Sequence, residues 1–173
     1  MDYHMTNQVI SKARKIKLLL TDIDGVWTDT GVYYSARGEE LKRFSIRDGM
    51  GVERLRELVG VETGIITGEN SAAVVKRAEK LGIGEVHLNV RHKASVITAI
   101  MEKRLFAPEE VAYIGDDTND LEALSIVGLS ACPADAVSAV REVVDHVCER
   151  AGGHGAFRDC AELIILSKKE ETT

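Results

Sequence analysis

Short apolar runs alternate along this chain with longer segments of helical periodicity, and this alternation restricts the possible folds more than any other feature. The apolar runs are typical of buried strands; they lie at residues 17–21, 62–67, 85–88, 111–115, 128–131 and 146–148. Helical patterns separate them, at residues 51–59, 71–81, 93–105, 121–126, 136–144 and 155–166. Ser71 and either Asp117 or Thr118 are the expected caps at two helix starts. Such alternation predicts a doubly wound, Rossmann-like α/β fold, in which a parallel sheet carries helices on both faces.

One segment interrupts the alternation. Residues 31–45 contain two short strand patterns around Ala36-Arg37-Gly38, which predicts a β-hairpin insert. The total of 173 residues suits a single domain spanning 1–173 and is too short for two ordinary ones. We expect the polar tail, residues 167–173, to be mobile.

Charge and cysteine usage exclude several classes of partner. The formal net charge of -6 argues against nucleic acid or an anionic membrane surface as the main partner. No apolar stretch of about 18 residues is present to span a bilayer, and residues 1–17 do not resemble a secretory signal. Cys132, Cys148 and Cys160 are widely spaced and odd in number, which favours reduced core thiols in a cytoplasmic protein.

The first apolar run ends in Asp22-Ile23-Asp24-Gly25. In an extended chain the two carboxylates lie on the same side, and like charges that close repel each other unless a cation joins them. Gly25 lets the backbone turn sharply as it leaves the sheet. This pair therefore indicates a divalent metal, a catalytic task or both, although an isolated pair of this kind is more often a polar turn.

Three later features also fall at expected strand or helix ends. Thr67 ends an apolar run and can offer its hydroxyl to a phosphate, together with free helix amides. Lys93 stands near a helix start, where it can hold a phosphate as a point charge. Asp116, followed by Asp117 and Asp120, can complete a Mg²⁺ site begun by Asp22 if the two strands are neighbours. Each feature taken alone also fits an ordinary turn, helix cap or solvated side chain.

The order of these features, DxDG, then Thr, then Lys, then GDDxxD, resembles the haloacid dehalogenase-like phosphatase superfamily. The resemblance implies that Asp22 is the nucleophile and forms an aspartyl-phosphate. It implies that Asp24 is the general acid and base, with its backbone carbonyl facing the metal. Thr67 and Lys93 then hold the phosphoryl oxygens.

The same resemblance implies a Mg²⁺ cofactor. Its expected ligands are Asp22, Asp24 and Asp116, with Asp117 and Asp120 as supporting acids. Thus the four catalytic residues implied by the resemblance are Asp22, Asp24, Thr67 and Lys93.

The resemblance narrows to the phosphatases of 3-deoxy-2-keto sugar acids because of the short hairpin, Arg47-Asp48-Gly49 and the segment Gly152-Gly153-His154-Gly155-Ala156-Phe157-Arg158. Those enzymes are capless homotetramers in which a neighbouring subunit helps to cover the site. The resemblance therefore implies a phosphorylated sugar acid as substrate and a homo-oligomer, a tetramer with shared active sites. In this arrangement the hairpin takes the place of a cap domain and lies at the interface.

Two substrate branches exist in that family. One hydrolyses 3-deoxy-D-manno-octulosonate 8-phosphate, a lipopolysaccharide precursor; the other hydrolyses nine-carbon ulosonate 9-phosphates, such as 2-keto-3-deoxynononate or N-acylneuraminate 9-phosphate. Glu53 and Glu69 stand where the eight-carbon branch usually has arginine, whereas Glu69 with Lys80 resembles the nine-carbon branch. Arg77 keeps the eight-carbon option open, and Thr30 replaces the glycine that is usual in both. We therefore expect a nine-carbon substrate, with the eight-carbon compound as the alternative.

The resemblance gives a set of expected substrate-binding residues: Thr67, Gly68, Glu69, Arg77, Lys80, Lys93, Arg47, Asp48 and Gly49. Trp27 can line the pocket or belong to the core. Two other classes stay open at this stage, a receiver-like signalling domain and a non-catalytic oligomerising module. The first places its acidic pair before its phospho-acceptor, and the second is expected to have lost Asp22, Asp24 or Lys93.

Overall fold

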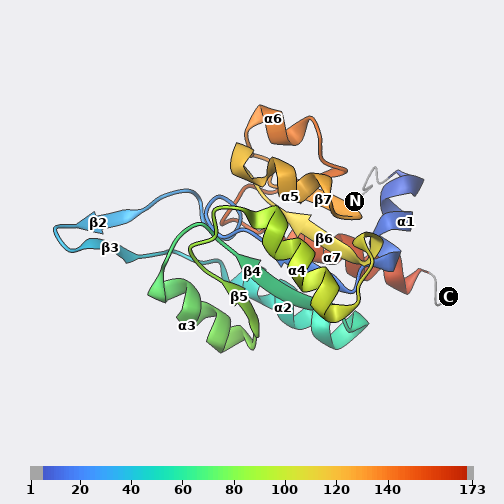
Figure 1. Cartoon of the computed structure of the whole chain (residues 1–173), viewed down its shortest axis with the longest axis horizontal. Helices are drawn as coiled ribbons and strands as arrows, with labels where there is room; N and C mark the ends of the chain where they lie inside the picture. Colours follow the sequence, from blue (N-terminus) through green and yellow to red (C-terminus); the bar gives the residue numbers. More distant parts are fainter. Residues whose placement is uncertain (1–5, 171–173) are drawn as a thin grey trace.

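A computed structural model describes residues 6–170 of the chain. Its centre is a sheet of six strands in the order β5-β4-β1-β6-β7-β8, and every neighbouring pair is parallel (Figure 1). The strands are β1 (Leu18–Thr21), β4 (Glu62–Ile66), β5 (Glu85–His87), β6 (Val111–Ile114), β7 (Leu129–Cys132) and β8 (His146–Val147). The parallel strand order confirms the Rossmann-like fold.

Helices cover both faces of this sheet. They are α1 (Asn7–Lys15), α2 (Ile46–Val59), α3 (Ala72–Leu81), α4 (Lys93–Arg104), α5 (Leu121–Ser125), α6 (Ser138–Arg141) and α7 (Ala156–Lys169), with 3₁₀ turns η1 (Pro108–Glu110) and η2 (Thr118–Asp120). The buried side chains of α1, α2, α3 and α7 form one apolar core, and those of α4, α5 and α6 form the other. No helix of residues 6–170 is long and apolar enough to cross a membrane.

Strand β1 shows why the sequence folds this way. Leu19 belongs to one core while Leu18 and Leu20 belong to the other, because successive side chains point to opposite faces. Each fully buried leucine contributes about 1.5–3 kcal/mol. Thr21 pairs in register with Ile65 of β4 and Ile114 of β6. The residues that follow these three strands therefore emerge at one edge of the sheet.

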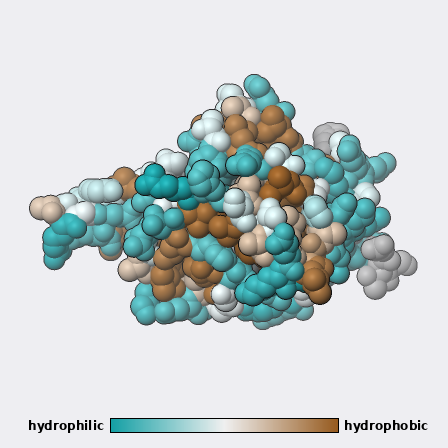
Figure 2. All heavy atoms as spheres, in the orientation of Figure 1, coloured by the Kyte–Doolittle hydropathy of each residue, from teal (hydrophilic) through white to brown (hydrophobic). Residues whose placement is uncertain are grey.

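The hairpin consists of β2 (Tyr33–Ser35) and β3 (Gly38–Leu41), which pair antiparallel and form a sheet of their own. It extends from the body of the molecule as a thin arm (Figures 1 and 2). Between β1 and β4 the chain contains this hairpin and α2, so no further domain is inserted there. The expected hairpin insert is therefore present where a cap domain would otherwise lie.

Several boundaries differ from the sequence-based expectation. Helix α1 was not expected, because it buries only Val9 and Ala13 among polar residues. Helix α2 begins at Ile46 rather than residue 51, since the Ser45 hydroxyl accepts a hydrogen bond from the Arg47 N–H and caps it. The expected helix at 136–144 is a single turn. Ser71 precedes α3 but makes no capping hydrogen bond through its side chain, whereas Asp117 caps η2.

The expectation of a mobile tail from residue 167 was wrong for its first part. Helix α7 continues to Lys169, and Ser167 is buried. The Arg14 guanidinium donates a hydrogen bond to the Ser167 carbonyl, and Lys168 donates one to the Arg14 carbonyl, which ties this turn to α1. Residues 171–173 lie outside the described part of the chain.

Candidate active site

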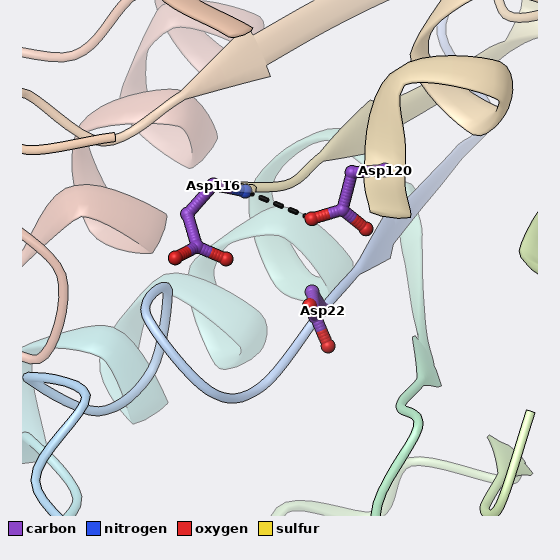
Figure 3. Close-up of side chains that lie close together, drawn as sticks. All are labelled: Asp22, Asp116 and Asp120. Carbon is purple, nitrogen blue, oxygen red and sulfur yellow. Dashed lines mark hydrogen bonds between the residues drawn. The ribbon is translucent and has the colours of Figure 1, made fainter. Parts of the chain in front are cut away.

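Three carboxylates meet at the carboxyl edge of the sheet. Asp22 follows β1, Asp116 follows β6 by two residues, and Asp120 ends η2. Each offers one oxygen, and these oxygens all lie within 4.8 Å of one another. Figure 3 shows the three side chains together, with the Asp116 N–H directed at the Asp120 carboxylate. Since β1 and β6 are neighbours, the condition for a site shared by Asp22 and Asp116 is met.

Lys93 contacts two carboxylates of this acidic cluster. It is the first residue of α4, is only 3% exposed, and places its Nζ 2.6 Å from Asp22 Oδ2 and 2.6 Å from Asp120 Oδ1. Burial alone disfavours the ammonium, but the two carboxylates outweigh it, and the pKa of Lys93 lies above its usual value. Lys93 is therefore a fixed positive charge next to Asp22.

Asp120 holds the other groups in place. Its Oδ1 also accepts a hydrogen bond of 2.6 Å from the Tyr113 hydroxyl, and its Oδ2 accepts the N–H groups of Asp116 at 3.0 Å and Asp117 at 3.3 Å. A side chain on Gly115 would collide with Asp120. With Lys93 included, both oxygens of Asp120 are fully used, so this residue orients its neighbours rather than reacting.

The cluster has more negative charge than Lys93 can balance. Burial and then the charge of Asp120 raise the pKa of Asp22 to about 7, against the opposing effect of Lys93. Burial and then Asp22 and Asp120 raise the pKa of Asp116 to about 8. A divalent cation bound by carboxylate oxygens would offset both shifts, because it balances the excess negative charge. The residues present therefore fit a Mg²⁺ ion.

Asp24 lies apart from this trio. Its side chain lines the same cavity, but Oδ1 is 2.6 Å from Nζ of Lys42, and the buried Oδ2 has no hydrogen-bond partner among the described residues. The third carboxylate close to Asp22 and Asp116 is that of Asp120, and the Asp24 side chain is not part of this cluster. The expected metal contact of Asp24 through its backbone carbonyl stays a prediction.

The catalytic cavity has a volume of about 230 Å³. Its lining comprises Asp22, Asp24, Thr30, Thr67, Gly68, Glu69, Asp116, Asp117 and Asn119. A second cavity of about 500 Å³ lies between the hairpin and the start of α3, and it shares Gly68 and Glu69 with the first. The structure thus brings the expected Asp22, Asp24, Thr67 and Asp116 to one space.

Sequence reasoning did not assign Thr30 and Asn119 to the site. Thr30 has a left-handed backbone with φ of 65°, which explains why glycine is the residue expected at this position. Asn119 lies in the η2 turn between Asp117 and Asp120. The only available signal for Asn119 was its place inside the GDDxxD motif.

Several expected substrate-binding residues lie outside both cavities. Asp48 is buried and accepts a hydrogen bond of 2.9 Å from the Arg158 N–H, which joins α2 to α7. Arg77 donates to the Ser45 carbonyl at 3.0 Å, and a side chain on Gly49 would collide with it. Lys80 is exposed on α3. These four of the nine expected substrate-binding residues therefore line neither of the two joined cavities in one copy of the chain: Asp48, Gly49, Arg77 and Lys80.

Two further positions are clear. Arg47 lines a third cavity, of about 370 Å³, together with Arg43 and His154. Trp27 is fully buried, packs against Phe157 and donates its indole N–H to the Thr21 hydroxyl. Trp27 therefore belongs to the core and does not line the catalytic cavity.

Comparison with known proteins agrees with this geometry. The family model described as haloacid dehalogenase-like hydrolase matches residues 59–157. The 3-deoxy-D-manno-octulosonate 8-phosphate phosphatase of Escherichia coli is 40% identical over 160 residues, which cover 92% of this chain and 85% of the relative. The fold and the site define a metal-dependent phosphomonoester hydrolase. The chain belongs to the haloacid dehalogenase-like hydrolases and, within them, to the capless phosphatase family that contains the Escherichia coli relative.

Solved structures support the same assignment. The Moraxella catarrhalis 3-deoxy-D-manno-octulosonate 8-phosphate phosphatase, in complex with a magnesium ion, a phosphate ion and a KDO molecule, has a TM-score of 0.91 and 33% identity and covers 95% of this chain and 94% of its own. The cobalt-bound Haemophilus influenzae phosphatase has a TM-score of 0.88 and 35% identity, covering 93% and 94%. These metals agree with the expected divalent cofactor. Membership of this enzyme family removes the receiver-like and non-catalytic alternatives, and the relatives favour the eight-carbon alternative over our nine-carbon preference.

Proposed function

We propose that this chain is a Mg²⁺-dependent phosphatase that removes the terminal phosphate of 3-deoxy-D-manno-octulosonate 8-phosphate, a step in lipopolysaccharide precursor synthesis. The buried contact of Lys93 with Asp22 carries the proposal, because it prepares a carboxylate to receive a phosphoryl group. The extended similarity to phosphatases with this substrate in their names supports the choice of sugar acid.

The chain's own residues can carry both half-reactions. An oxygen of Asp22 attacks phosphorus while the ester P–O bond breaks, and the protonated Asp24 donates its proton to the departing sugar oxygen. Water then attacks phosphorus, Asp24 accepts a proton from it, and the acyl-phosphate bond breaks to release phosphate and restore Asp22. Mg²⁺ held by Asp22, Asp116 and the Asp24 carbonyl would supply positive charge at the phosphoryl oxygens.

The remaining residues of the site hold the phosphoryl group. Lys93 contributes a buried positive charge, kept in position by Asp120. Thr67 is buried at the end of β4 and faces the same cavity, where its hydroxyl can donate to a phosphoryl oxygen. Asp117 stands at the cavity wall and caps η2, so its supporting role is to fix the loop that carries Asp116.

The second cavity suits the sugar. It joins the catalytic cavity at Gly68 and Glu69, and its wall also includes Asn70, Ser71 and Asn89. Carboxylate, amide and hydroxyl groups of this kind pair well with sugar hydroxyls. A phosphate placed at Asp22 thus leaves the sugar chain to extend past Glu69 into this space.

Glu69 favours a second candidate, a nine-carbon ulosonate 9-phosphate such as 2-keto-3-deoxynononate or N-acylneuraminate 9-phosphate. Its carboxylate lines both cavities, and it repels a substrate carboxylate unless a cation lies between them. A longer sugar acid can present hydroxyl groups to Glu69 and carry its own carboxylate further away. This observation keeps the nine-carbon branch as the competing substrate.

We also propose that the enzyme is a homo-oligomer, a tetramer whose copies share active sites. Among the described residues, no Lys, Arg or His lines either of the two joined cavities, although a sugar acid brings a carboxylate that needs a cation. Tyr34 is 70% exposed and Leu41 64% exposed on the hairpin, as expected of a surface that contacts another copy. Arg47, exposed in the third cavity, is the candidate cation donor.

A mixing experiment tests the shared site. Asp22→Asn and Arg47→Ala proteins are each purified, combined under exchange conditions and assayed for phosphate release. If Arg47 serves a neighbouring copy, the mixture regains activity that neither variant has alone. If the mixture releases phosphate no faster than the separate variants, and the protein has a monomeric mass in solution, the shared tetramer is contradicted.

A cytoplasmic location is proposed as well. Cys132, Cys148 and Cys160 are free and buried, which is typical of proteins from a reducing compartment. Burial raises the pKa of the Cys132 thiol to about 12, so it stays protonated and unreactive. Measuring activity in soluble and membrane fractions of the source cells tests this placement.

The decisive experiment measures phosphate release with Mg²⁺ from the eight-carbon and nine-carbon ulosonate phosphates side by side. We expect a higher kcat/KM for 3-deoxy-D-manno-octulosonate 8-phosphate. Glucose 6-phosphate, which lacks the carboxylate, is the matched control and is expected to be a poor substrate. A clear preference for the nine-carbon compound would overturn the substrate assignment while leaving the phosphatase assignment intact.

A further inference from the structure

Lys42 joins the hairpin to the catalytic cavity. It follows β3 directly, and its side chain is fully buried, with Nζ 2.6 Å from Asp24 Oδ1 and 3.2 Å from Glu39 Oε2. Burial opposes the charge, but the two carboxylates outweigh it and the pKa of Lys42 lies above its usual value. A buried ammonium costs free energy unless it is paired, so Lys42 is held at these two carboxylates.

The contact makes the two oxygens of Asp24 unequal. Oδ1 is held by Lys42, whereas the buried Oδ2 has no hydrogen-bond partner among the described residues. An unpartnered buried oxygen is costly in a resting structure, and it is the atom left for a proton. Holding one oxygen of a carboxyl group also fixes the plane of the group and the direction of its other oxygen.

We propose that Lys42 is a positioning residue that holds Asp24 by Oδ1, so that Oδ2 alone carries the proton given to the departing sugar oxygen and later taken from water. The inference rests on the proposed phosphatase function. It gives the hairpin a second task besides covering the cavity, because displacement of the hairpin would also release Asp24. Lys42 touches neither the phosphate nor the reacting atoms in this assignment.

A comparison of leaving groups tests this role. The departing p-nitrophenolate is weakly basic and needs no proton, whereas a departing sugar alkoxide does. In Lys42→Met we expect kcat/KM for 3-deoxy-D-manno-octulosonate 8-phosphate to fall about 10- to 100-fold. The first turnover of p-nitrophenyl phosphate, followed by stopped flow as a burst of nitrophenolate, should keep its rate within about twofold.

The matched control is Lys76→Met, which removes a lysine that pairs with Glu79 on the exposed face of α3. It should leave both substrates unaffected. Lys42→Gln, which retains a neutral donor, serves if Lys42→Met does not fold, and an intermediate loss is expected for it. Equal losses of sugar-phosphate turnover and of the nitrophenolate burst would show that Lys42 supports the whole site and would overturn the proposal.

A double-mutant cycle separates this role from a structural one. In an Asp24→Asn background, Lys42→Met should reduce kcat/KM for the sugar-acid phosphate by no more than about twofold further, because its effect passes through Asp24. The same fold-loss in both backgrounds would overturn the inference. If the unmodified chain hydrolyses neither substrate, the proposed function itself fails, which is a different result from a failure of Lys42 alone.

Discussion

The sheet edge and the hairpin, which form the two walls of the site, are built in opposite ways. The sheet side carries Asp22, Lys93 and Asp120, which are buried, and Lys93 Nζ lies 2.6 Å from an oxygen of each carboxylate. The hairpin side carries Tyr34 and Leu41, which are mostly exposed on a two-stranded ribbon outside the main sheet. The first wall is complete within one copy of the chain, whereas an isolated hairpin is only marginally stable in water.

This difference separates the reaction from the choice of substrate. The groups proposed for phosphoryl transfer are held by the sheet and by neighbouring side chains, so they depend on the core. The groups that meet the sugar lie where the hairpin, α3 and a proposed second copy come together. Changes in the sheet wall should therefore affect every phosphate ester, and changes in the hairpin wall should affect only sugar acids.

The largest expected effect is that of Asp22→Asn. An amide cannot act as the nucleophile, so turnover of both p-nitrophenyl phosphate and the sugar-acid phosphate should fall by a factor on the order of 10⁴ to 10⁶. The fold should be kept, because Asn can still accept the Ile23 N–H bonded to Asp22 Oδ1 at 2.7 Å. Steady-state phosphate release and circular dichroism check the two points. Retained activity with either ester would contradict the mechanism.

The next effect concerns metal and pH. The pKa of Asp116 is about 8 in the folded chain against 3.8 as its unperturbed value, so the metal-free folded state binds the extra proton. Stability without metal should therefore fall as pH rises from about 4 to 8. Asp116→Asn should remove part of this loss and be more stable than the unmodified chain at pH 8 by about 2 kcal/mol.

Mg²⁺ should reverse the order of these two proteins. At a concentration about 100 times its dissociation constant, the ion stabilises the unmodified chain by about 2.7 kcal/mol, whereas Asp116→Asn should gain far less. Urea unfolding at pH 5 and pH 8, with EDTA or with Mg²⁺, measures each case. Equal stabilisation of both proteins by Mg²⁺ would place the ion somewhere other than at Asp116.

The contrast between the two walls also explains what could be predicted from sequence. The sheet was predicted because each strand is a local apolar run, and the register of β1 with β4 and β6 brings Asp22, Thr67 and Asp116 to one edge. The role of Asp120 in holding Lys93, and of Tyr113 in holding Asp120, was not predictable to this detail. They depend on side chains that meet only after the strands have packed.

The errors lie where long-range packing decides local structure. The expected helix began only at residue 51, whereas in the structure it already includes Arg47-Asp48-Gly49. In the fold this segment is the first turn of α2, and Asp48 is buried where it accepts the Arg158 N–H. Likewise, polar residues 167–169 extend α7 because α1 packs against them. No local pattern contains either partner.

A smaller effect is expected from the hairpin. Tyr33 and Leu41 pair across its two strands, and both are more than half exposed. Tyr33→Ser combined with Leu41→Ser should dissociate the oligomer and lower kcat/KM for the sugar-acid phosphate about 10- to 100-fold, the usual range for losing a central interface contact. The first turnover of p-nitrophenyl phosphate should change less than about threefold. Analytical ultracentrifugation reports the assembly, and an unchanged mass with unchanged kinetics would contradict the proposed interface.

The smallest predicted effect tests which sugar acid the open wall selects. Glu69→Arg exchanges a carboxylate that lines both cavities for a cation, so it should attract the carboxylate of the shorter substrate. We expect the ratio of kcat/KM for the eight-carbon over the nine-carbon phosphate to rise about tenfold, equivalent to about 1.4 kcal/mol. Glu57→Arg, an exposed charge reversal on α2, is the matched control and should leave the ratio unchanged. Because Glu69 lies beyond the groups proposed to bind phosphate, Glu69→Arg and the control should have the same kcat/KM for p-nitrophenyl phosphate. A difference between them would mean that Glu69 affects the sheet wall. The separation between reaction and substrate selection would then not hold at this residue.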